Sequence, residues 1–426
     1  MTDTKTIINQ LENGNFDERL LDIYVDKEVI AYQRNRYKRA IQSFVNHFGE
    51  SEVELYSAPG RSEIGGNHTD HQHGEVLAAS INKDAIAVVK PMEESVVRVV
   101  SEGYNMITIP LNDLDRKEEE KESTLALLKG VLAGIIQHGY QIGGFQAYIT
   151  SDVLIGAGLS SSAAYETLIG ILLSGIYNAG KISPNEIAVI GQYAENVYFG
   201  KPCGLMDQMA CSVGNLVYID FANPDTPKTE RIDFDFNHYN YSLCITDTKG
   251  SHADLTADYA AIPKEMKKVA QFFGKEVLRE VSQELLLEHL SEVRDAVGDR
   301  AVLRALHFVC ENIRVHQEME ALNQGNLNKF FYLVKESGNS SFKYLQNVYA
   351  SHDIEHQNIS VALAISDMFL GTRGVSRVHG GGFAGTIQAF VENDAVDGYQ
   401  ERMDSVFGKG ACNVLKVRKH GGIKVF

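Results

Sequence analysis

The chain has 426 residues, of which 44% are hydrophobic and 23% charged, and its formal net charge is −16 at pH 7. This length predicts two domains, each large enough to bury an apolar interior. The negative charge argues against nucleic acid or an anionic membrane surface as a partner. Because the sequence has no apolar run of membrane-spanning length and no signal-peptide pattern at its start, we expect a cytoplasmic protein.

Hydrophobic periodicity and turn residues predict the secondary structure of the first half. In chain order they predict a helix over 26–48 that ends at Gly49, a strand from Val53 to Ser57, a hairpin of strands 85–90 and 96–101, a solvated loop over 113–122, a strand over 145–150, a helix over 163–179 and a helix from Pro184 to about Tyr198. The last of these helices begins with a capping box, Ser183-Pro184-Asn185-Glu186.

The second half is rich in predicted helices. The patterns indicate strands over 216–220, 242–246 and 387–391, and helices within 262–274, 299–322, 326–337 and 354–370. The segment Asn223-Pro224-Asp225-Thr226-Pro227 interrupts the pattern. We therefore predict two domains, 1–230 and 231–426.

A glycine-serine segment, Gly156-Ala157-Gly158-Leu159-Ser160-Ser161-Ser162, precedes the predicted helix over 163–179. Its glycines allow backbone N–H groups to converge on an anion, and the helix N-terminus adds donors and the positive end of its dipole. A serine hydroxyl there can also reach Mg²⁺. No Lys-Ser/Thr pair follows the glycines, so this is not a P-loop. The segment is either a phosphate loop of another kinase class or a small-residue turn that caps a buried helix.

Two polar segments are candidates for substrate chemistry. The first, Ser57 to His71, places a guanidinium, an imidazole, an amide and a carboxylate in a glycine-punctuated loop, which suits the hydroxyls of a sugar or is a surface loop rich in turn formers. The second runs from Glu195 to Gln208. Asp207 lies there among apolar residues, and it is either an active-site acid or a helix cap.

A third segment, Gly380-Gly381-Gly382-Phe383-Ala384-Gly385, formally matches the dinucleotide pattern GxGxxG. A dinucleotide site requires a preceding strand, a following helix and room for a βαβ unit. This segment lies near the C-terminus and a strand-like pattern follows it, so we reject the Rossmann interpretation.

Taken together, these segments resemble the galactokinases, a branch of the GHMP small-molecule kinases. The resemblance rests on APGRSEIGGNHTD, IGAGLSSSAAYE, GKPCGLMDQ and HGGGFAGTIQAFV, which occur in the order of the family from about residue 50 to the C-terminus. It implies a two-domain α+β GHMP kinase fold, with a ribosomal-protein-S5-like N-terminal domain, a ferredoxin-like C-terminal domain and an active site at their junction. It also implies ATP-dependent phosphorylation of the C1 hydroxyl of galactose.

The resemblance implies a role for each matching residue. Asp207 would face the anomeric hydroxyl, with Arg61 beside it as the second catalytic residue. The sugar would be bound by Asn67, His68, Asp70, Gly204 and Tyr259. The ATP phosphates would be wrapped by Gly156, Ala157, Gly158, Leu159, Ser160, Ser161 and Ser162, with Gly381 and Gly382 shaping the site from the second domain. Mg²⁺ would be held by Ser162 and Glu195. The expected partners are a sugar and ATP, with no nucleic acid and no membrane, and a monomer or weak homo-oligomer is expected.

The match departs from the family on the sugar side. Asn67 replaces the glutamate that usually precedes the histidine, and Glu63, Gly65 and Gly66 also differ from the common pattern, as does the segment 260–263 after Tyr259. An amide in place of a carboxylate exchanges an acceptor for a donor, so a uronic acid, an N-acetylhexosamine or a pentose is an alternative substrate. A sensor that binds ATP and sugar without turnover is a further alternative, which the retained serines, Glu195 and Asp207 disfavour. A GHMP kinase for mevalonate or an amino alcohol is disfavoured by the polar cluster from Arg61 to Asp70.

Overall fold

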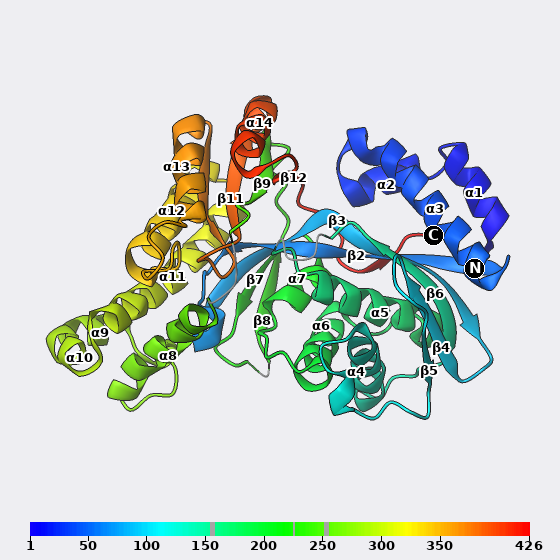
Figure 1. The fold of residues 1–426 in the computed structure, drawn as a ribbon, viewed down its shortest axis with the longest axis horizontal. Coiled ribbons are helices and arrows are strands. Elements are labelled where there is room, and N and C mark those ends of the chain that lie inside the picture. Colours follow the sequence, from blue (N-terminus) through cyan, green and yellow to red (C-terminus); the bar gives the residue numbers. More distant parts are fainter. Residues whose placement is uncertain (154–157, 225, 251–254) are drawn as a thin grey trace. The chain divides into compact units, whose positions relative to one another are not determined.

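The computed structural model describes residues 1–153, 158–224, 226–250 and 255–426, which form two compact units (Figure 1). The first unit consists of Met1–Arg61, Ala79–Asn215 and Val417–Phe426, and the second of Ser62–Ala78 and Leu216–Lys416. Each unit is thus assembled from separate parts of the chain. A single division at residue 230 does not describe this arrangement, and that division stays a prediction, as does an active site at a domain junction.

The first unit contains a mostly antiparallel sheet with the strand order β1–β2–β3–β6–β4–β5, and β13 pairs with β2. The strands are β1 (Thr2–Asp3), β2 (Glu52–Gly65), β3 (Glu75–Met92), β4 (Val96–Ser101), β5 (Ile107–Pro110), β6 (Gly144–Ser151) and β13 (Ile423–Lys424). The predicted hairpin of 85–90 and 96–101 is wrong, because β6 lies between the two strands, antiparallel to β3 and parallel to β4. β6 is buried over most of its length and takes a central place that a local turn pattern does not reveal.

Helices cover both faces of this sheet (Figure 1). They are α1 (Thr4–Glu12), α2 (Asp17–Tyr24), the short η1 (Lys27–Val29), α3 (Ile30–Phe48), η3 (Glu118–Glu120), α4 (Thr124–Gln137), α5 (Ser161–Asn178), α6 (Pro184–Tyr193), η4 (Ala194–Phe199) and α7 (Met206–Val213). Side chains alternate along a strand. Ala85 and Val89 of β3 therefore pack with α4, α5 and α6, whereas Ile86 and Val88 pack with α1, α2 and α3.

A buried ionic cluster ties the N-terminal helices to the end of β6. The carboxylate of Asp84 in β3 binds Nη1 of Arg36 at 2.6 Å and Nη1 of Arg418 at 3.0 Å, and it accepts a hydrogen bond from the hydroxyl of Tyr24 at 2.8 Å. The backbone carbonyl of Asp84 accepts a hydrogen bond from the N–H of Asp152, just after β6. The end of β6 is therefore held in place from α3.

The second unit contains an antiparallel sheet with the order β10–β11–β9–β12, and β7 pairs with β8 and with β3. Its elements are η2 (Asp70–Gln72), β7 (Leu216–Asp220), β8 (Lys228–Ile232), β9 (Tyr241–Asp247), α8 (Thr256–Phe272), η5 (Leu278–Glu280), α9 (Gln283–Glu288), α10 (Leu290–Val297), α11 (Asp299–Asn323), α12 (Leu327–Ser340), η6 (Ser341–Leu345), α13 (Asn358–Leu370), β10 (Gly374–His379), β11 (Thr386–Glu392), η7 (Asn393–Ala395), α14 (Val396–Phe407) and β12 (Cys412–Leu415). α13 and α14 pack with Val378 and Ala389, while Phe390 on the opposite face meets Phe330 of α12.

The predicted helices and the other predicted strands are present, most with ends that shift by a few residues. Two strands are longer than predicted: β2 continues to Gly65 through part of the predicted loop, and β3 begins at Glu75. The helix expected over 163–179 is α5, and the helix expected over 299–322 is α11. In the described part of the chain, no helix is long and apolar enough to cross a membrane.

Candidate active site

The first unit joins Arg61 and Asp207 by a two-point ion pair. Nε of Arg61 lies 2.6 Å from Oδ1 of Asp207, and its Nη2 lies 2.9 Å from Oδ2. This fork is a strong and directional form of the contact between a guanidinium and a carboxylate. Burial acts to raise the pKa of Asp207, but the charge and hydrogen bonds of Arg61 hold that pKa below its usual value. Asp207 is therefore ionised at neutral pH.

Asp207 lies in the first turn of α7, where the helix dipole favours negative charge. The residue that caps this helix is Leu205, so Asp207 is not the helix cap that the sequence left as an alternative. Its side chain is 30% exposed, so a ligand can reach it. Its catalytic role, like that of Arg61, stays a prediction.

The end of the glycine-serine segment is bonded to the same ion pair. The Nη1 of Arg61 donates to the carbonyl of Gly158, and the hydroxyl of Ser160 donates to Oδ2 of Asp207. Ser160 has a φ of 57°, and its carbonyl accepts the N–H of Ala164 in the first turn of α5. Leu159 accepts the backbone N–H of Arg61 at 3.1 Å. Gly156 and Ala157, which we predicted to bind phosphate, lie outside the described residues.

Ser162 and Glu195, the predicted metal ligands, lie together. Ser161 and Ser162 open α5, and the hydroxyl of Ser162 lies 3.1 Å from Oε1 of Glu195. Glu195 belongs to a π-helical turn, η4, which replaces the last turn of the helix predicted over 184–198. Such turns insert one residue and recur at functional sites. Here the turn places the Glu195 carboxylate in the interior.

Gln208 is a residue of this site that the sequence analysis missed. Its Nε2 donates to Oε2 of Glu195 at 2.8 Å and to Oε2 of Glu166 at 3.0 Å, and Gln208 is fully buried. Burial, together with the charge of Glu195, raises the pKa of Glu166 well above its usual value. Gln208 thus fixes one oxygen of Glu195 and leaves Oε1 toward Ser162. The signal that could have found Gln208 was its place next to Asp207, among apolar residues.

The pair Ser162 and Glu195 fits Mg²⁺ by its chemistry. A hydroxyl and a carboxylate oxygen are hard donors, and Mg²⁺ in phosphoryl-transfer enzymes is bound by one or two protein oxygens, waters and the phosphates of the substrate. Glu195 also binds Lys201, whose Nζ lies 3.3 Å from its Oε1. Ser162 and Glu195 can therefore supply the protein ligands of such a Mg²⁺ site.

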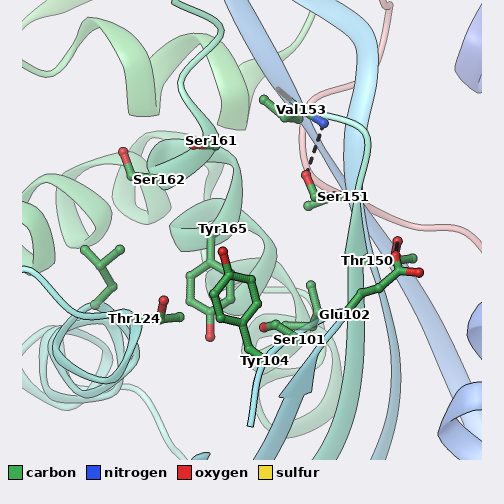
Figure 2. A pocket seen from close by; sticks show the side chains of 13 residues that line it. Ser101, Glu102, Tyr104, Thr124, Thr150, Ser151, Val153, Ser161, Ser162 and Tyr165 are labelled. Carbon is green, nitrogen blue, oxygen red and sulfur yellow. Dashed lines mark hydrogen bonds between the residues drawn. The ribbon is translucent and has the colours of Figure 1, made fainter. Parts of the chain in front are cut away.

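A cavity of about 520 Å³ opens beside the start of α5 (Figure 2). Figure 2 shows Ser161 and Ser162 on one side of it and the rings of Tyr104 and Tyr165 nearby. The other lining residues are Ala85, Ser101, Glu102, Thr124, Leu127, Ile149, Thr150, Ser151 and Val153. Only the two serines were predicted; apart from Tyr165 of α5, the remaining residues come from β3, β4, β6, α4 and their loops, which sequence patterns do not bring together.

In the second unit, the loop after β2 is locked by the side chain of Asn67, which is only 1% exposed. Its Nδ2 donates to Oε1 of Glu63 at 3.0 Å and to the carbonyl of Gly380 at 2.6 Å. Its Oδ1 accepts from Nδ2 of Asn347 at 2.8 Å and from the hydroxyl of Ser341 at 3.3 Å. All four hydrogen-bonding positions of the amide are therefore used within this unit.

His68, Tyr259 and the two predicted glycines lie together in the same unit. The Nε2 of His68 lies 3.0 Å from the carbonyl of Gly381, and the hydroxyl of Tyr259 donates to the carbonyl of Gly382 at 2.8 Å. Burial, together with the neighbouring His71, lowers the pKa of His68 to about 4. A Cβ at Gly381 would lie 2.7 Å from the ring of Tyr259, which explains the glycine there.

Asp70 and Gly204 are the other two predicted sugar ligands. Asp70 begins η2, and its Oδ1 accepts the backbone N–H of His71 at 3.0 Å. The His71 ring centroid is 5.8 Å from that of His68. Gly204 belongs to the first unit, in the loop between η4 and α7. The substrate contacts of both residues stay predictions.

A polar stripe on α11 supports the Asn67 loop and was also missed. His307, Glu311, Arg314 and Glu318 recur at spacings of four, three and four residues, which is one face of a helix. The Nε2 of His307 lies 2.9 Å from the carbonyl of Asn67, and Oε1 of Glu311 accepts the N–H of Gly66 at 3.3 Å. Burial acts against the charge of Glu311, but Arg314 and His307 lower its pKa to about 2. The helical spacing of these polar residues was the available signal.

Comparison with known families agrees with this geometry. The galactokinase galactose-binding signature matches residues 42–91, and the GHMP kinase N-terminal domain matches residues 126–215. The first match contains Arg61, Asn67, His68 and Asp70, and the second contains Ser162, Glu195 and Asp207. The two matches therefore cover the predicted site residues that precede residue 216, and Tyr259, Gly381 and Gly382 lie outside them.

Relatives match over most of the chain. A galactokinase of Glaesserella parasuis is 32% identical over 364 residues, which is 83% of this chain and 89% of the relative, and one of Clostridium tetani is 29% identical over 86% of this chain and 91% of the relative. The crystal structure of Lactococcus lactis galactokinase complexed with galactose has 25% identity and a TM-score of 0.74, covering 90% of this chain and 98% of that one. Methanococcus jannaschii mevalonate kinase, at 14% identity and a TM-score of 0.61 over 86% and 99% of the two chains, shares the fold. The predicted α+β GHMP kinase fold is confirmed, and the chain belongs to the galactokinase family.

Proposed function

We propose that this protein transfers the γ-phosphoryl group of ATP to the C1 hydroxyl of galactose. Its family implies ATP as the phosphoryl donor, and its relatives are named as galactokinases. The observation that carries the proposal is the ion pair of Arg61 and Asp207, bonded to Ser160 at the start of α5. This places an ionised carboxylate next to a helix N-terminus that suits phosphate.

Asp207 takes the proton of the sugar hydroxyl as the new P–O bond forms. A carboxylate with a lowered pKa is far too weak a base to deprotonate an alcohol beforehand, so proton transfer accompanies attack. General base assistance of this kind contributes about 10²–10⁴-fold to the rate. Arg61 keeps Asp207 ionised and fixes its orientation through both nitrogens. The proton passes from the C1 oxygen to Asp207, and the β–γ bond of ATP breaks to release ADP.

The start of α5 binds the phosphates of ATP. Backbone N–H groups in the first turn of a helix have no partner within the helix and point toward an anion. Ser161 and Ser162 line the 520 Å³ cavity as well, so we assign this cavity to the nucleoside part of ATP. Gly158, Leu159 and Ser160 extend this phosphate-binding site toward Asp207.

Mg²⁺ would be held by Ser162 and Glu195, and it would neutralise charge on the phosphates of ATP. Gln208 positions Glu195 for this task, since its amide fixes one carboxylate oxygen at 2.8 Å. Transfer of a phosphoryl group depends mainly on alignment and charge neutralisation, so this positioning matters to the rate.

His68, Asp70, Gly204 and Tyr259 recognise the sugar. The low pKa of His68 keeps its ring neutral at physiological pH. Because a carbonyl can only accept, Nε2 must carry the hydrogen that reaches Gly381, and Nδ1 is then an acceptor for a sugar hydroxyl. Gly381 and Gly382 shape this region through His68 and Tyr259. Asn67 belongs to the same sugar site, and its role is developed below.

An ADP-release assay with Mg-ATP and a panel of hexoses, uronic acids, hexosamines and pentoses tests the proposal. We expect galactose to give the highest kcat/KM. Activity confined to another sugar class would contradict the proposed substrate, and binding of ATP and sugar without ADP release would identify a sensor.

A further inference from the structure

The residues that depart from the galactokinase pattern on the sugar side contact one connected cluster of the second unit. Glu63 binds Nη2 of Arg377 at 2.5 Å and accepts from Asn67 at 3.0 Å. A Cβ at Gly65 would collide with the buried carboxylate of Glu318. Glu63 and Gly65 thus fit the same cluster, and their neighbours Arg377 and Glu318 lie on β10 and α11.

The orientation of the Asn67 amide follows from its neighbours. Its NH₂ group faces Oε1 of Glu63 and the carbonyl of Gly380, both of which only accept, while its oxygen faces the donors of Asn347 and Ser341. The guanidinium of Arg377 is fully buried and forms an ion pair with Glu63. A donor at position 67 is therefore required, and a carboxylate there would face two acceptors.

Asn67 links the loop that carries His68 to the glycine segment. It binds the carbonyl of Gly380 directly, and its partner Asn347 donates to the carbonyl of Gly381 at 3.2 Å. His68, the next residue, has a left-handed φ of 59° and reaches the same carbonyl of Gly381. The conformation of His68 thus depends on hydrogen bonds that Asn67 makes.

We propose that Asn67 is a positioning residue for sugar recognition, which acts through Glu63, Gly380 and Asn347 to hold His68 in place and does not itself contact the sugar. This role rests on the proposed function, and it makes an amide at position 67 compatible with galactose. The affinity for the sugar depends on the direction of the hydrogen bond between residues 67 and 63.

The isosteric variant Asn67→Asp tests this dependence. It replaces the donor by an acceptor without changing the shape of the side chain. We expect the KM for galactose at pH 8 to rise at least about tenfold, with the KM for ATP changed less than about threefold. Because Oε1 of Glu63 accepts from both Asn67 and Arg377, the second variant is Asn67→Ala, which removes the donor at position 67 without adding an acceptor. We expect its galactose KM to rise less than that of Asn67→Asp.

A pH profile separates this role from general loss of structure. The groups around position 67 that carry charge or titrate are Glu63 on β2, His68 beside it, Arg377 and His379 on β10, and His307, Glu311, Arg314 and Glu318 on α11. Protonation of the new carboxyl would restore a donor. The galactose KM of Asn67→Asp should therefore fall by several-fold from pH 8 to pH 6, while that of the wild type changes less.

Asn323→Asp is the matched control. Nδ2 of Asn323 also lies 3.0 Å from a glutamate oxygen, Oε1 of Glu230, but this pair is exposed. We expect a wild-type galactose KM for this variant, and thermal unfolding establishes that all variants are folded.

Three results decide between the outcomes. A wild-type galactose KM in Asn67→Asp would overturn the positioning role. A galactose KM of Asn67→Ala that equals or exceeds that of Asn67→Asp would overturn the assigned hydrogen-bond direction and with it the proposal. A wild-type protein that phosphorylates no galactose and shows no heat of binding with it would contradict the proposed function, which distinguishes that failure from the other two.

Discussion

The two units hold their candidate functional residues in different ways. In the first unit, Asp207 is 30% exposed and is fixed by a charged fork to Arg61. In the second unit, Asn67 is 1% exposed and every hydrogen-bonding position of its amide is used. The first arrangement leaves a reactive group open to a ligand, and the second leaves a recognition loop rigid. Substitutions in the first unit should therefore change rates with little effect on stability, whereas those in the second should change affinity and stability together.

The variant Asp207→Asn should have the largest effect, and it tests whether a substitution in the first unit changes the rate without changing stability. Loss of the proton acceptor should lower kcat by at least about 10²–10⁴-fold, while ATP binding and the melting temperature stay close to those of the wild type. The measurement is the rate of formation of sugar phosphate, with ATP affinity from calorimetry.

Asp17→Asn is its control, because Asp17 also lies in the first turn of a helix and pairs with an arginine Nε, that of Arg34 at 3.2 Å. It should keep wild-type kcat. Substantial turnover by the Asp207→Asn variant would show that Asp207 is not the general base.

Glu195→Gln should give the next largest effect. It keeps the size of the side chain but removes the charge that would hold Mg²⁺, so the Mg²⁺ concentration for half-maximal rate should rise about 10–100-fold. Titration of Mg²⁺ at fixed ATP measures this shift. An unchanged Mg²⁺ requirement would exclude Glu195 as a metal ligand.

Gly65→Ala sharpens the contrast from the side of the second unit. The added methyl group meets the carboxylate of Glu318, which is fully buried and would have to shift. Overpacking of this kind costs about 1–3 kcal/mol. Urea unfolding should show that loss together with a weaker affinity for galactose. Wild-type stability with wild-type affinity would show that the loop tolerates change.

The smallest expected effect is the pH dependence contributed by His68. Its folded-state pKa of about 4 lies below the usual value of 6.5, so the unfolded chain takes up the proton first as the pH falls. The stabilisation is therefore complete above about pH 6.5 and is lost progressively toward pH 4, at a cost of about 2 kcal/mol by pH 5. His68→Gln should flatten this part of the profile of unfolding free energy against pH. An identical profile would show that His68 is not buried as described.

The phosphate side was the more predictable of the two. Its helices follow from hydrophobic periodicity, and Arg61, Ser162, Glu195 and Asp207 stand in motifs that the sequence displays directly. The π-helical turn at Glu195 and the role of Gln208 were not predictable, because they depend on packing between α5, η4 and α7.

The sugar side shows the limit of sequence reasoning more clearly. The departure at Asn67 was visible, but its partners Asn347 and His307 lie more than 200 residues away in the chain, and sequence patterns do not show that residues so far apart meet. The central position of β6 was missed for the same reason, since long-range pairing leaves little local trace.

The most direct test of the proposed reaction is the structure of its product. Wild-type protein should be incubated with Mg-ATP and galactose and followed by phosphorus and proton NMR. We predict a sugar phosphate whose phosphorus couples to H1 of galactose, formed in equal amount with ADP. Phosphate on another oxygen of the sugar, or ADP formed without any sugar phosphate, would contradict it.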